Sequence, residues 1–315
     1  MKVYKIAVIG FGSIGKRHLN NIYDVLTSKN ISFTIDLIRR SNSNTIDGIT
    51  LKLINNVYTS YEDIPNDYDI IFIANPTNLH YQTIKKYIHK TKHMFIEKPV
   101  FDDSKLSVDD LKIKENAIYY VACPLRYTDV IQYIKNNVDI STILNVRVIC
   151  SSYLPDWRAN VDYRSTYSAR KSEGGGVSLD LIHEWDYIQY LFGLPKKVYN
   201  LKGRFSELEI DCEDLSVYIA EYDKMLIELH LDYFGRKAIR EVQIITKDDT
   251  IIADLINSKI RYLCNGNEIS FKETRNDFQI KEIEYFFDLI EGKVLNHNNL
   301  DMAVQTLKIA KDGII

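Results

Sequence analysis

The chain has 315 residues, of which 45% are hydrophobic, so it can fill one or two buried cores and is too long for a typical single domain. Its 40 basic and 43 acidic residues are spread along the chain and leave a net charge of −3. This balance excludes the basic surface of a protein that binds nucleic acid or an acidic membrane. We therefore expect two domains and small-molecule partners.

The first recognisable element is an apolar run that leads into the motif Gly10-x-Gly12-x-x-Gly15. A strand, a glycine turn and a helix start in this order are typical of a dinucleotide-binding Rossmann fold. The first glycine permits the turn, the second lets backbone approach a pyrophosphate, and the third lets the helix pack closely on the strand. We expect the phosphates to lie on the backbone N–H groups of this turn, which continues through Ser13 and Ile14.

Residues 32–39 form a second predicted strand, whose tip is where a Rossmann fold reads the adenosine ribose. NAD-dependent enzymes usually place a carboxylate there, but this chain has Arg39, Arg40 and Ser41. Guanidinium groups and a hydroxyl suit the 2′-phosphate of NADP, and Asp36 falls inside the strand rather than at its tip. The sequence favours NADP over NAD, with a solvated basic turn as the alternative.

Three more buried strands are predicted at residues 68–74, 93–96 and 118–123, alternating with helix-like segments. This alternation predicts a doubly wound parallel sheet, an α/β fold.

Polar residues follow two of these strands at the sheet edge where cofactors bind. Asn75, Pro76 and His80 come after the first strand, and Glu97 and Lys98 come after the second. We expect all five at the cofactor, with the lysine, fixed by a following proline, over its nicotinamide end. A surface lysine at a strand end is the alternative.

From about residue 142 the pattern changes to consecutive strands with short turns, which predicts a large, mostly antiparallel sheet. The predicted strands are 142–152, 197–205, 215–222, 225–233, 241–247 and 259–264. We predict a dinucleotide-binding domain over residues 1–122 and an α+β domain for substrate binding and oligomerisation over 123–315. A helix at about 300–312 is a candidate to pack back toward the first domain.

One helix interrupts these strands, after a glycine triplet, and is predicted to extend to residue 192. Trp185 and Ile188 belong to an apolar stripe that should pack on the sheet. Asp180, His183 and Tyr187 fall on another face. A lone histidine on a helix is more often structural, but a carboxylate one turn before it indicates acid–base chemistry.

Residues 155–171 form a long loop rich in arginine, tyrosine and tryptophan. Such a composition suits a polyhydroxylated or phosphorylated ligand, and a mobile surface excursion is the alternative. We take Trp157 and Tyr163 from this loop as candidate substrate-binding residues, together with Arg126, which follows the strand at 118–123.

The four cysteines, at 123, 150, 212 and 264, are far apart and lack metal-ligand spacing, so we expect reduced core thiols and no metal. The N-terminal apolar run is short and has no cleavage site, and no segment is long enough to cross a bilayer. We expect a cytoplasmic protein.

These motifs occur in one order that resembles the glucose–fructose oxidoreductase / inositol dehydrogenase / rhizopine catabolism (Gfo/Idh/MocA) family of NAD(P)-dependent oxidoreductases. The resemblance covers nearly the whole chain. It rests on Gly10-x-Gly12-x-x-Gly15-x-x-His18, Asn75-Pro76-x-x-x-His80, Glu97-Lys98-Pro99, Arg126 and Gly174-Gly-Gly-x-x-x-Asp180-x-x-His183-x-x-Asp186.

The resemblance implies that Lys98 is the active-site lysine, Asp180 orients substrate and His183 is the acid or base. The commoner family spacing places the histidine four residues after the aspartate, whereas here it is three. Which group transfers the proton is therefore open. The stretches 154–163 and 180–187 also resemble members associated with bacterial surface-sugar biosynthesis.

We accordingly expect hydride transfer between nicotinamide and a carbon of a sugar or sugar derivative, in a homodimer or homotetramer. A nucleotide sugar used in surface-polysaccharide biosynthesis is one such substrate. Two alternatives are an NAD-dependent glycoside hydrolase of the same fold and a non-catalytic sensor of a dinucleotide or sugar.

Overall fold

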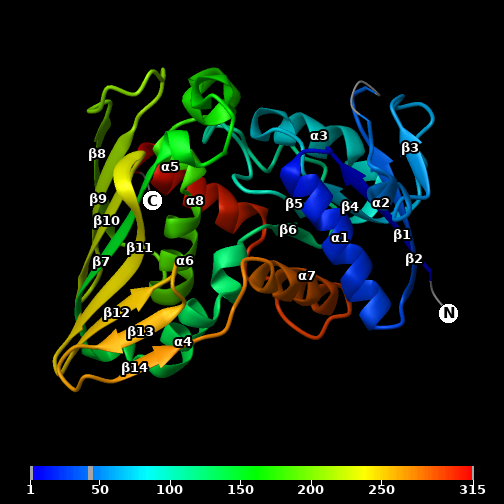
Figure 1. Ribbon diagram of the computed structural model, residues 1–315. Helices are drawn as coiled ribbons and strands as arrows, with labels where there is room; N and C mark the ends of the chain where they lie inside the picture. Colours follow the sequence, from blue (N-terminus) through cyan, green and yellow to red (C-terminus); the bar gives the residue numbers. More distant parts are fainter. Residues whose placement is uncertain (1–2, 42–44, 314–315) are drawn as a thin grey trace. The chain divides into compact units, whose positions relative to one another are not determined.

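The computed structural model describes residues 3–41 and 45–313 and divides into two compact units. The first unit combines Met1–Ala122 with Gln279–Ala303, and the second combines Cys123–Phe278 with Val304–Ile315 (Figure 1). The expected break after residue 122 coincides with this division. Residues 279–303, which we had assigned to the second domain, group with the first unit instead.

The first unit contains a six-stranded parallel sheet with the order β3-β2-β1-β4-β5-β6. β2 and β3 lie on one side of β1, and β4, β5 and β6 lie on the other side. The strand order therefore reverses between β1 and β4, which is the point at which doubly wound folds bind ligands. The predicted Rossmann fold is confirmed. Its strands are β1 (Val3–Ile9), β2 (Ser32–Ile38), β3 (Asn56–Tyr58), β4 (Tyr68–Ile73), β5 (Thr91–Ile96) and β6 (Tyr119–Val121).

Four helices belong largely to this unit: α1 (Ser13–Ser28), α2 (Gly48–Leu51), α3 (His80–Tyr87) and α7 (Asp277–Ile290). Phe72 of β4 and Phe95 of β5 stack with ring centroids 4.8 Å apart, and Phe286 of α7 packs edge-on against both. His18 of α1 lies on the same two rings. This aromatic cluster explains why α7, late in the sequence, belongs to the first unit, a return that strand and helix patterns alone do not reveal.

The second unit contains an eight-stranded sheet with the order β14-β13-β12-β11-β7-β10-β9-β8. All neighbours are antiparallel except β10 and β7. This confirms the predicted large, mostly antiparallel sheet. Its strands are β7 (Ile143–Tyr153), β8 (Lys197–Gly203), β9 (Leu215–Glu221), β10 (Leu226–Asp232), β11 (Phe234–Thr246), β12 (Thr250–Asp254), β13 (Lys259–Tyr262) and β14 (Glu268–Ser270).

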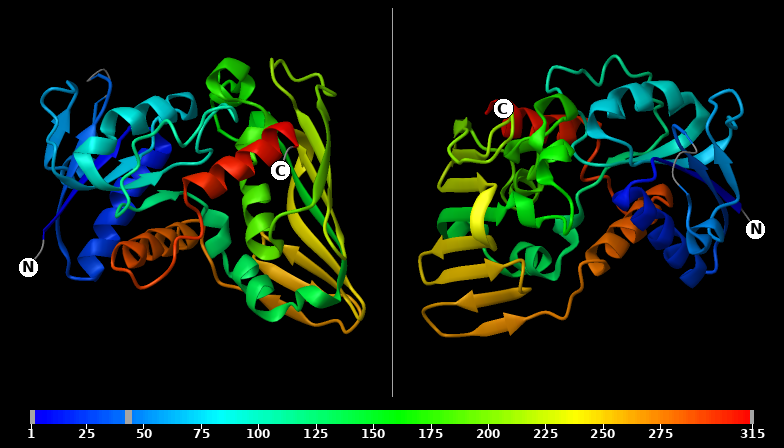
Figure 2. Two further views of the ribbon diagram at one scale, coloured as in Figure 1. Left: turned by 180° about the vertical axis from the view of Figure 1, so that it is seen from behind. Right: turned by 45° about the horizontal axis from the view of Figure 1, so that its top comes forward.

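The helices of the second unit are α4 (Asp129–Asn137), α5 (Val177–Asp180), α6 (His183–Phe192) and α8 (Leu300–Asp312), and they cover one face of this sheet (Figures 1 and 2). Trp185 of α6 meets Tyr218 of β9 edge-on, with ring centroids 5.3 Å apart. In α8, Thr306 donates to Gln189 of α6, and the Ala310 carbonyl accepts from Tyr218. From residue 304 onward the last helix belongs to the second unit, and its first residues, 300–303, group with the first unit.

Among the residues of the second unit that the structure describes, no helix lies on the opposite face of the sheet (Figure 2). Tyr199, Leu201 and Ile219 lie on it and are 53%, 70% and 38% exposed. Arg147 and Glu228 form an ion pair beside them, since β7 and β10 pair in that register. The sheet thus presents a mixed apolar and charged surface.

The predicted single helix through residues 180–192 is wrong in one respect. It consists of two helices, α5 and α6, separated at Leu181 and Ile182. Leu181 has φ −98° and ψ 22°, outside helical values, so Asp180 and His183 do not share one continuous helical face. The apolar stripe is confirmed, because Trp185 and Ile188 are fully buried.

The cysteine prediction is right for three of the four residues. Cys123, Cys150 and Cys212 are buried free thiols, but Cys264 is exposed. Its position between β13 and β14, in a hairpin connection, accounts for the exposure, because such connections lie on the surface.

Candidate active site

The glycine turn between β1 and α1 has three different geometries. Gly10 has φ +103°. A Cβ on Gly10 would lie 2.6 Å from the carbonyl oxygen of Ala74, the residue that directly follows β4. A Cβ on Gly15 would lie 2.3 Å from the Gly10 carbonyl oxygen. A Cβ on Gly12 would meet nothing within 4 Å. Gly10 and Gly15 are therefore required by the fold itself, whereas the space over Gly12 suits a group that approaches the backbone closely.

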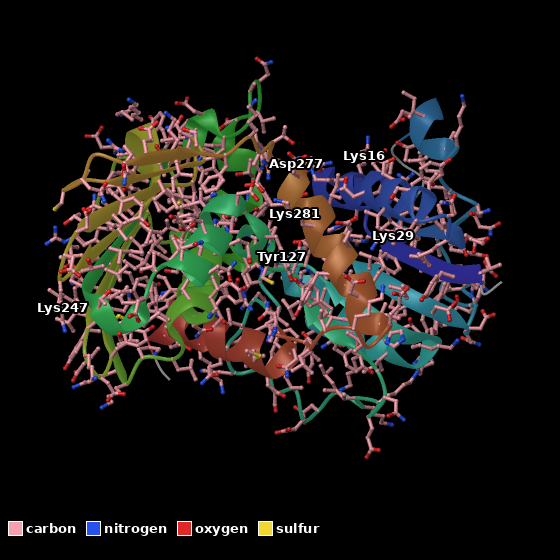
Figure 3. The ribbon with its side chains drawn as sticks, turned by 90° about the horizontal axis from the view of Figure 1, so that it is seen from below. Lys16, Lys29, Tyr127, Lys247, Asp277 and Lys281 are labelled. Carbon is pink, nitrogen blue, oxygen red and sulfur yellow. The ribbon has the colours of Figure 1, made fainter. Side chains whose placement is uncertain are left out.

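The first turn of α1 suits an anion. Gly12 is the N-cap and provides no side-chain cap, and no acidic residue lies in the first turn, which begins with Ser13 and Ile14. Lys16 lies on the same turn, with its ammonium group 4.9 Å from the Phe11 ring (Figure 3). Unpaired helix N–H groups with a nearby cation fit the pyrophosphate of a dinucleotide.

The tip of β2 provides no carboxylate for a ribose. Asp36 is buried inside the strand, where it accepts hydrogen bonds from Asn56 and from the hydroxyl of Tyr68. Arg39 follows the strand and lies over the Phe11 ring at 5.5 Å, beside the glycine turn. A cationic side chain thus lies beside the region where an adenosine ribose is bound in Rossmann folds.

The loop after β4 is braced by two side chains that we had predicted to meet the cofactor. His80 is buried between the carbonyl oxygens of Asn75 and Pro99, each 2.9 Å from a ring nitrogen. Burial lowers the pKa of His80, although the hydrogen bonds to these carbonyl oxygens work in the opposite direction. This geometry gives His80 a structural role that ties the loop after β4 to the one after β5. Pro76 begins the short 3-10 turn Thr77–Leu79 in the same loop.

Asn75 has one atom that suits a ligand. Its amide nitrogen donates to Thr83, but its Oδ1 is buried and has no hydrogen-bond partner among the described residues. A buried acceptor of this kind costs free energy unless a ligand or water donates to it. Together with the open space over Gly12, it shows that the residues at this sheet edge fit a bound dinucleotide.

Lys98 follows β5 and is held through its neighbour. His18 of α1 contacts Glu97 at 2.6 Å, Nε2 to Oε1, and the other Glu97 oxygen accepts from the Lys98 backbone N–H at 3.2 Å. Burial works against the charge of Glu97, yet His18 and Lys98 lower its pKa below the ordinary value. His18, which the sequence pattern contained without a role, thus fixes the segment that carries the lysine.

In the second unit, Asp180 is paired with a tyrosine. The Tyr233 hydroxyl, from the turn between β10 and β11, donates to Asp180 Oδ2 at 2.7 Å. Burial and then Asp180 raise the pKa of Tyr233 well above its ordinary value, and Asp180 also raises the pKa of Tyr167. Trp157 packs edge-on on Tyr233 with ring centroids 5.2 Å apart. The predicted substrate residues Trp157 and Asp180 are therefore brought together through Tyr233, which the sequence analysis missed.

Two other predicted substrate residues have structural partners. The Arg126 guanidinium, although buried, donates to both carboxylate oxygens of Asp186, at 2.8 and 2.7 Å. The Tyr163 hydroxyl accepts from the Glu209 backbone N–H at 3.1 Å. Bidentate pairing of a buried guanidinium leaves it little freedom to bind a ligand as well, so these geometries favour structural roles.

His183 lies in a buried ionic cluster that the sequence analysis did not foresee. Its Nε2 is 2.5 Å from Arg240 Nη2 and 3.1 Å from Glu184 Oε1, and Arg240 Nε is 3.0 Å from the same carboxylate oxygen. Tyr187 donates to the other oxygen of Glu184 at 2.5 Å. Burial works to raise the pKa of Glu184, but Arg240, His183 and Tyr187 together outweigh it and lower the pKa to about 2. The carboxylate is therefore ionised.

Arg240 and Glu184 had sequence signals. Arg240 shares its parity in β11 with the buried Val242 and Ile244, which places it on the inward face of the sheet. Glu184 precedes Trp185 and falls one turn before Ile188, inside the buried part of α6. A charged residue on the inward face of a strand and another in the buried part of a helix indicate a paired site.

Among residues 3–41 and 45–313, no cluster of side chains has the composition and spacing of a metal site. In the same part of the chain no helix is sufficiently long and apolar to cross a membrane.

The sequence is similar to those of several curated proteins. The inositol 2-dehydrogenase/D-chiro-inositol 3-dehydrogenase of Lacticaseibacillus casei is 26% identical over 194 residues, 60% of this chain and 53% of the relative. The chain thus spans about half the length of the curated relatives it matches.

Solved structures share the fold along the whole chain. A levoglucosan dehydrogenase in complex with NADH superposes with a TM-score of 0.83 at 16% identity, covering 99% of this chain and 96% of that one. The UDP-N-acetylglucosamine 3-dehydrogenase GnnA of Acidithiobacillus ferrooxidans gives 0.77 at 18% identity, covering 98% and 96%.

Residues 4–118, which hold the glycine turn and the segment through Lys98, match the model described as the oxidoreductase family with an NAD-binding Rossmann fold. This part of the chain is therefore similar to the Gfo/Idh/MocA family of oxidoreductases.

Proposed function

We propose that this protein is an NAD(P)-dependent oxidoreductase that transfers a hydride between nicotinamide and a carbon of a sugar or sugar derivative. The observation that carries the proposal is the arrangement of the first unit. The glycine turn after β1, Asn75 after β4 and Lys98 after β5 follow three adjacent parallel strands at their carboxyl ends. This edge is where open α/β sheets bind cofactors, and it holds a cation beyond the phosphate-binding turn.

The roles we propose for individual residues follow from their partners. Nicotinamide, when bound, supplies or accepts the hydride. Lys98, whose backbone is anchored by Glu97, polarises the reacting oxygen and exchanges its proton. Asp180, held by Tyr233, orients a substrate hydroxyl, and His183 acts on the reacting oxygen.

Sugars and their derivatives are the proposed substrate class for two reasons. Proteins of this fold include a levoglucosan dehydrogenase and a UDP-N-acetylglucosamine 3-dehydrogenase, and a relative acts on inositols. In addition, Trp157, 37% exposed and packed on the tyrosine that holds Asp180, offers an aromatic surface of the kind that covers sugar rings. A nucleotide sugar remains within this proposal.

The test is turnover with a panel of free sugars, inositols and nucleotide sugars, in both directions. One equivalent of reduced cofactor per equivalent of oxidised sugar supports the proposal. Glycosidic cleavage without net reduction of cofactor identifies the hydrolase, and tight binding of cofactor and sugar without turnover identifies the sensor. Either outcome overturns the proposal.

We further propose that NADP(H) is the preferred cofactor, because Asp36 is engaged by two neighbours and Arg39 lies beside the glycine turn. NADP(H) should bind at least about 10-fold more tightly than NAD(H), since a hydrogen bond to a charged group contributes about 1.5–3 kcal/mol. Replacing Arg39 and Arg40 with alanine should remove the preference, as measured by calorimetry.

The control for this pair is Lys29→Ala with Lys85→Ala, which removes the same charge from exposed positions at the ends of α1 and α3. It should leave the preference unchanged. Equal affinities for both cofactors in the unmodified protein contradict the assignment.

We propose that the protein is a homodimer or homotetramer formed through the helix-free face of the second sheet, since exposed apolar side chains on such a face favour burial against another subunit. Leu201→Glu, at a side chain that is 70% exposed on β8, should yield monomers in sedimentation experiments. Leu295→Glu makes the same change at a 76% exposed residue of the first unit and should not. A monomeric unmodified protein at micromolar concentration rules the interface out.

A further inference from the structure

The cluster around His183 determines which nitrogen of the imidazole ring carries the proton. The reason is that Nε2 of His183 faces a group that can only donate hydrogen bonds. A guanidinium has five N–H donors and no acceptor, and it keeps its charge at any physiological pH. Arg240 Nη2 lies 2.5 Å from His183 Nε2. At that distance a hydrogen on Nε2 would meet a hydrogen of the guanidinium. The short contact is compatible with a hydrogen bond only if Nε2 carries the lone pair and accepts.

The second neighbour of Nε2 supports this assignment. Glu184 Oε1 is 3.1 Å from Nε2, but among the described residues it has no partner in hydrogen-bond geometry. The charge of the carboxylate offsets that of Arg240. Its other oxygen is occupied by the Tyr187 hydroxyl at 2.5 Å.

The fold holds this geometry from two sides. Arg240 lies on β11 directly opposite the buried Cys150 of β7, and both pack toward α6. The side chain of Glu184 is fully buried, whereas those of His183 and Arg240 are 14% and 26% exposed. A buried carboxylate between a sheet cation and a helix histidine has few alternative conformations, because leaving either charge unpaired is costly.

We infer that Arg240, with its charge balanced by Glu184, is a positioning residue that fixes His183 as the neutral tautomer with its proton on Nδ1. In this tautomer the ring donates a hydrogen bond through Nδ1 and has no lone pair left at Nε2 to take up a proton. His183 then acts through Nδ1 as a hydrogen-bond donor rather than as a general base through Nε2. The proton leaves or arrives through Lys98. The tautomer assignment does not depend on the proposed function. Only the existence of a reacting substrate oxygen rests on that proposal.

The test reads the tautomer directly and needs no substrate. Two-bond proton–nitrogen correlation spectra of the full chain with labelled histidines distinguish a pyridine-type nitrogen from a pyrrole-type one, and His183→Asn identifies the signals of residue 183. We expect a pyridine-type Nε2 and a pyrrole-type Nδ1 near neutral pH. A protonated Nε2 in the unmodified protein overturns the inference, whatever the variants do.

Variants test whether Arg240 is the cause. Arg240→Met combined with Glu184→Gln removes both charges together, so it avoids the unpaired buried carboxylate that the single Arg240→Met change would leave. We expect the double variant to lose the fixed tautomer and Arg240→Lys to restore most of it, since lysine keeps a cationic donor. Arg147→Met, on the opposite face of β7, is the control and should leave the His183 signals unchanged. A fixed tautomer that persists in the double variant excludes Arg240 as its cause.

Kinetics give the second readout, once a substrate is known. The double variant should lower kcat about 10-fold, the value of one misaligned hydrogen bond, with cofactor affinity unchanged and with rescue by Arg240→Lys. If no sugar is turned over by the unmodified protein, the proposed function fails while the tautomer assignment stands. If a sugar is turned over and Nε2 is protonated, the proposed function stands and the tautomer assignment fails.

Discussion

Lys98→Met is expected to lower kcat by at least about 10²-fold, the smaller end of the effect of a positioned acid or base. Methionine keeps much of the lysine volume and removes the charge, so the loss reports on chemistry rather than on packing. Cofactor affinity should change little, because Lys98 does not belong to the phosphate-binding turn. Single-turnover rates and cofactor titrations measure the two quantities separately.

His183→Asn is the informative companion, because asparagine retains an N–H donor but cannot titrate. If His183 is a neutral donor, this variant should lose only about 10-fold in kcat, far less than Lys98→Met. A loss of about 10²-fold or more for His183→Asn, with Lys98→Met nearly active, would make the histidine the proton carrier. Full activity in both variants would show that neither acts in the reaction.

The first unit could be predicted well from sequence because its signals are local. The spacing of Gly10, Gly12 and Gly15 is a local pattern, and the strand before it reads as an apolar run. The position of Asp36 inside the strand was also visible in the sequence. Its partners Asn56 and Tyr68 were not visible, because they lie 20 and 32 residues away on other strands of the sheet.

The contacts at the candidate site of the second unit could not be predicted from local sequence patterns. Arg240 reaches His183 across 57 residues, and Tyr233 reaches Asp180 across 53, so neither pair has a local pattern. The break between α5 and α6 was also hidden, because the helical spacing continues through Leu181. Sheet parity could have placed Arg240 on the buried face, but not beside the histidine.

Arg126 illustrates the related limit of transferring a role by position. An arginine in a sequence that resembles a sugar-binding family suggests a ligand, yet burial and two hydrogen bonds to Asp186 join it to α6. Breaking such a pair leaves a buried charge uncompensated and typically costs about 3–5 kcal/mol. A loss of activity on replacing Arg126 would therefore need a stability measurement before it could be attributed to substrate binding.

Gly12→Ala should separate cofactor binding from folding. The backbone at Gly12 has φ −79° and ψ −171°, values open to alanine, and the added Cβ meets nothing within 4 Å. The free energy of unfolding should stay the same or rise by up to about 1 kcal/mol, because alanine restricts the unfolded chain. Cofactor affinity should fall about 10²-fold, since the methyl group displaces the pyrophosphate from about two charge-assisted hydrogen bonds of ~1.5 kcal/mol each.

Gly15→Ala, three residues along the same turn, is the matched control. Unlike Gly12→Ala, it should lower the free energy of unfolding. Its Cβ would lie 2.3 Å from the Gly10 carbonyl oxygen, so backbone must move and the free energy of unfolding should fall by about 1–3 kcal/mol. Urea denaturation and calorimetric titration of both variants give the comparison. If Gly12→Ala binds cofactor as tightly as the unmodified protein, the pyrophosphate does not lie over this turn. If it unfolds as readily as Gly15→Ala, the space over Gly12 belongs to the packing of the fold rather than to the ligand.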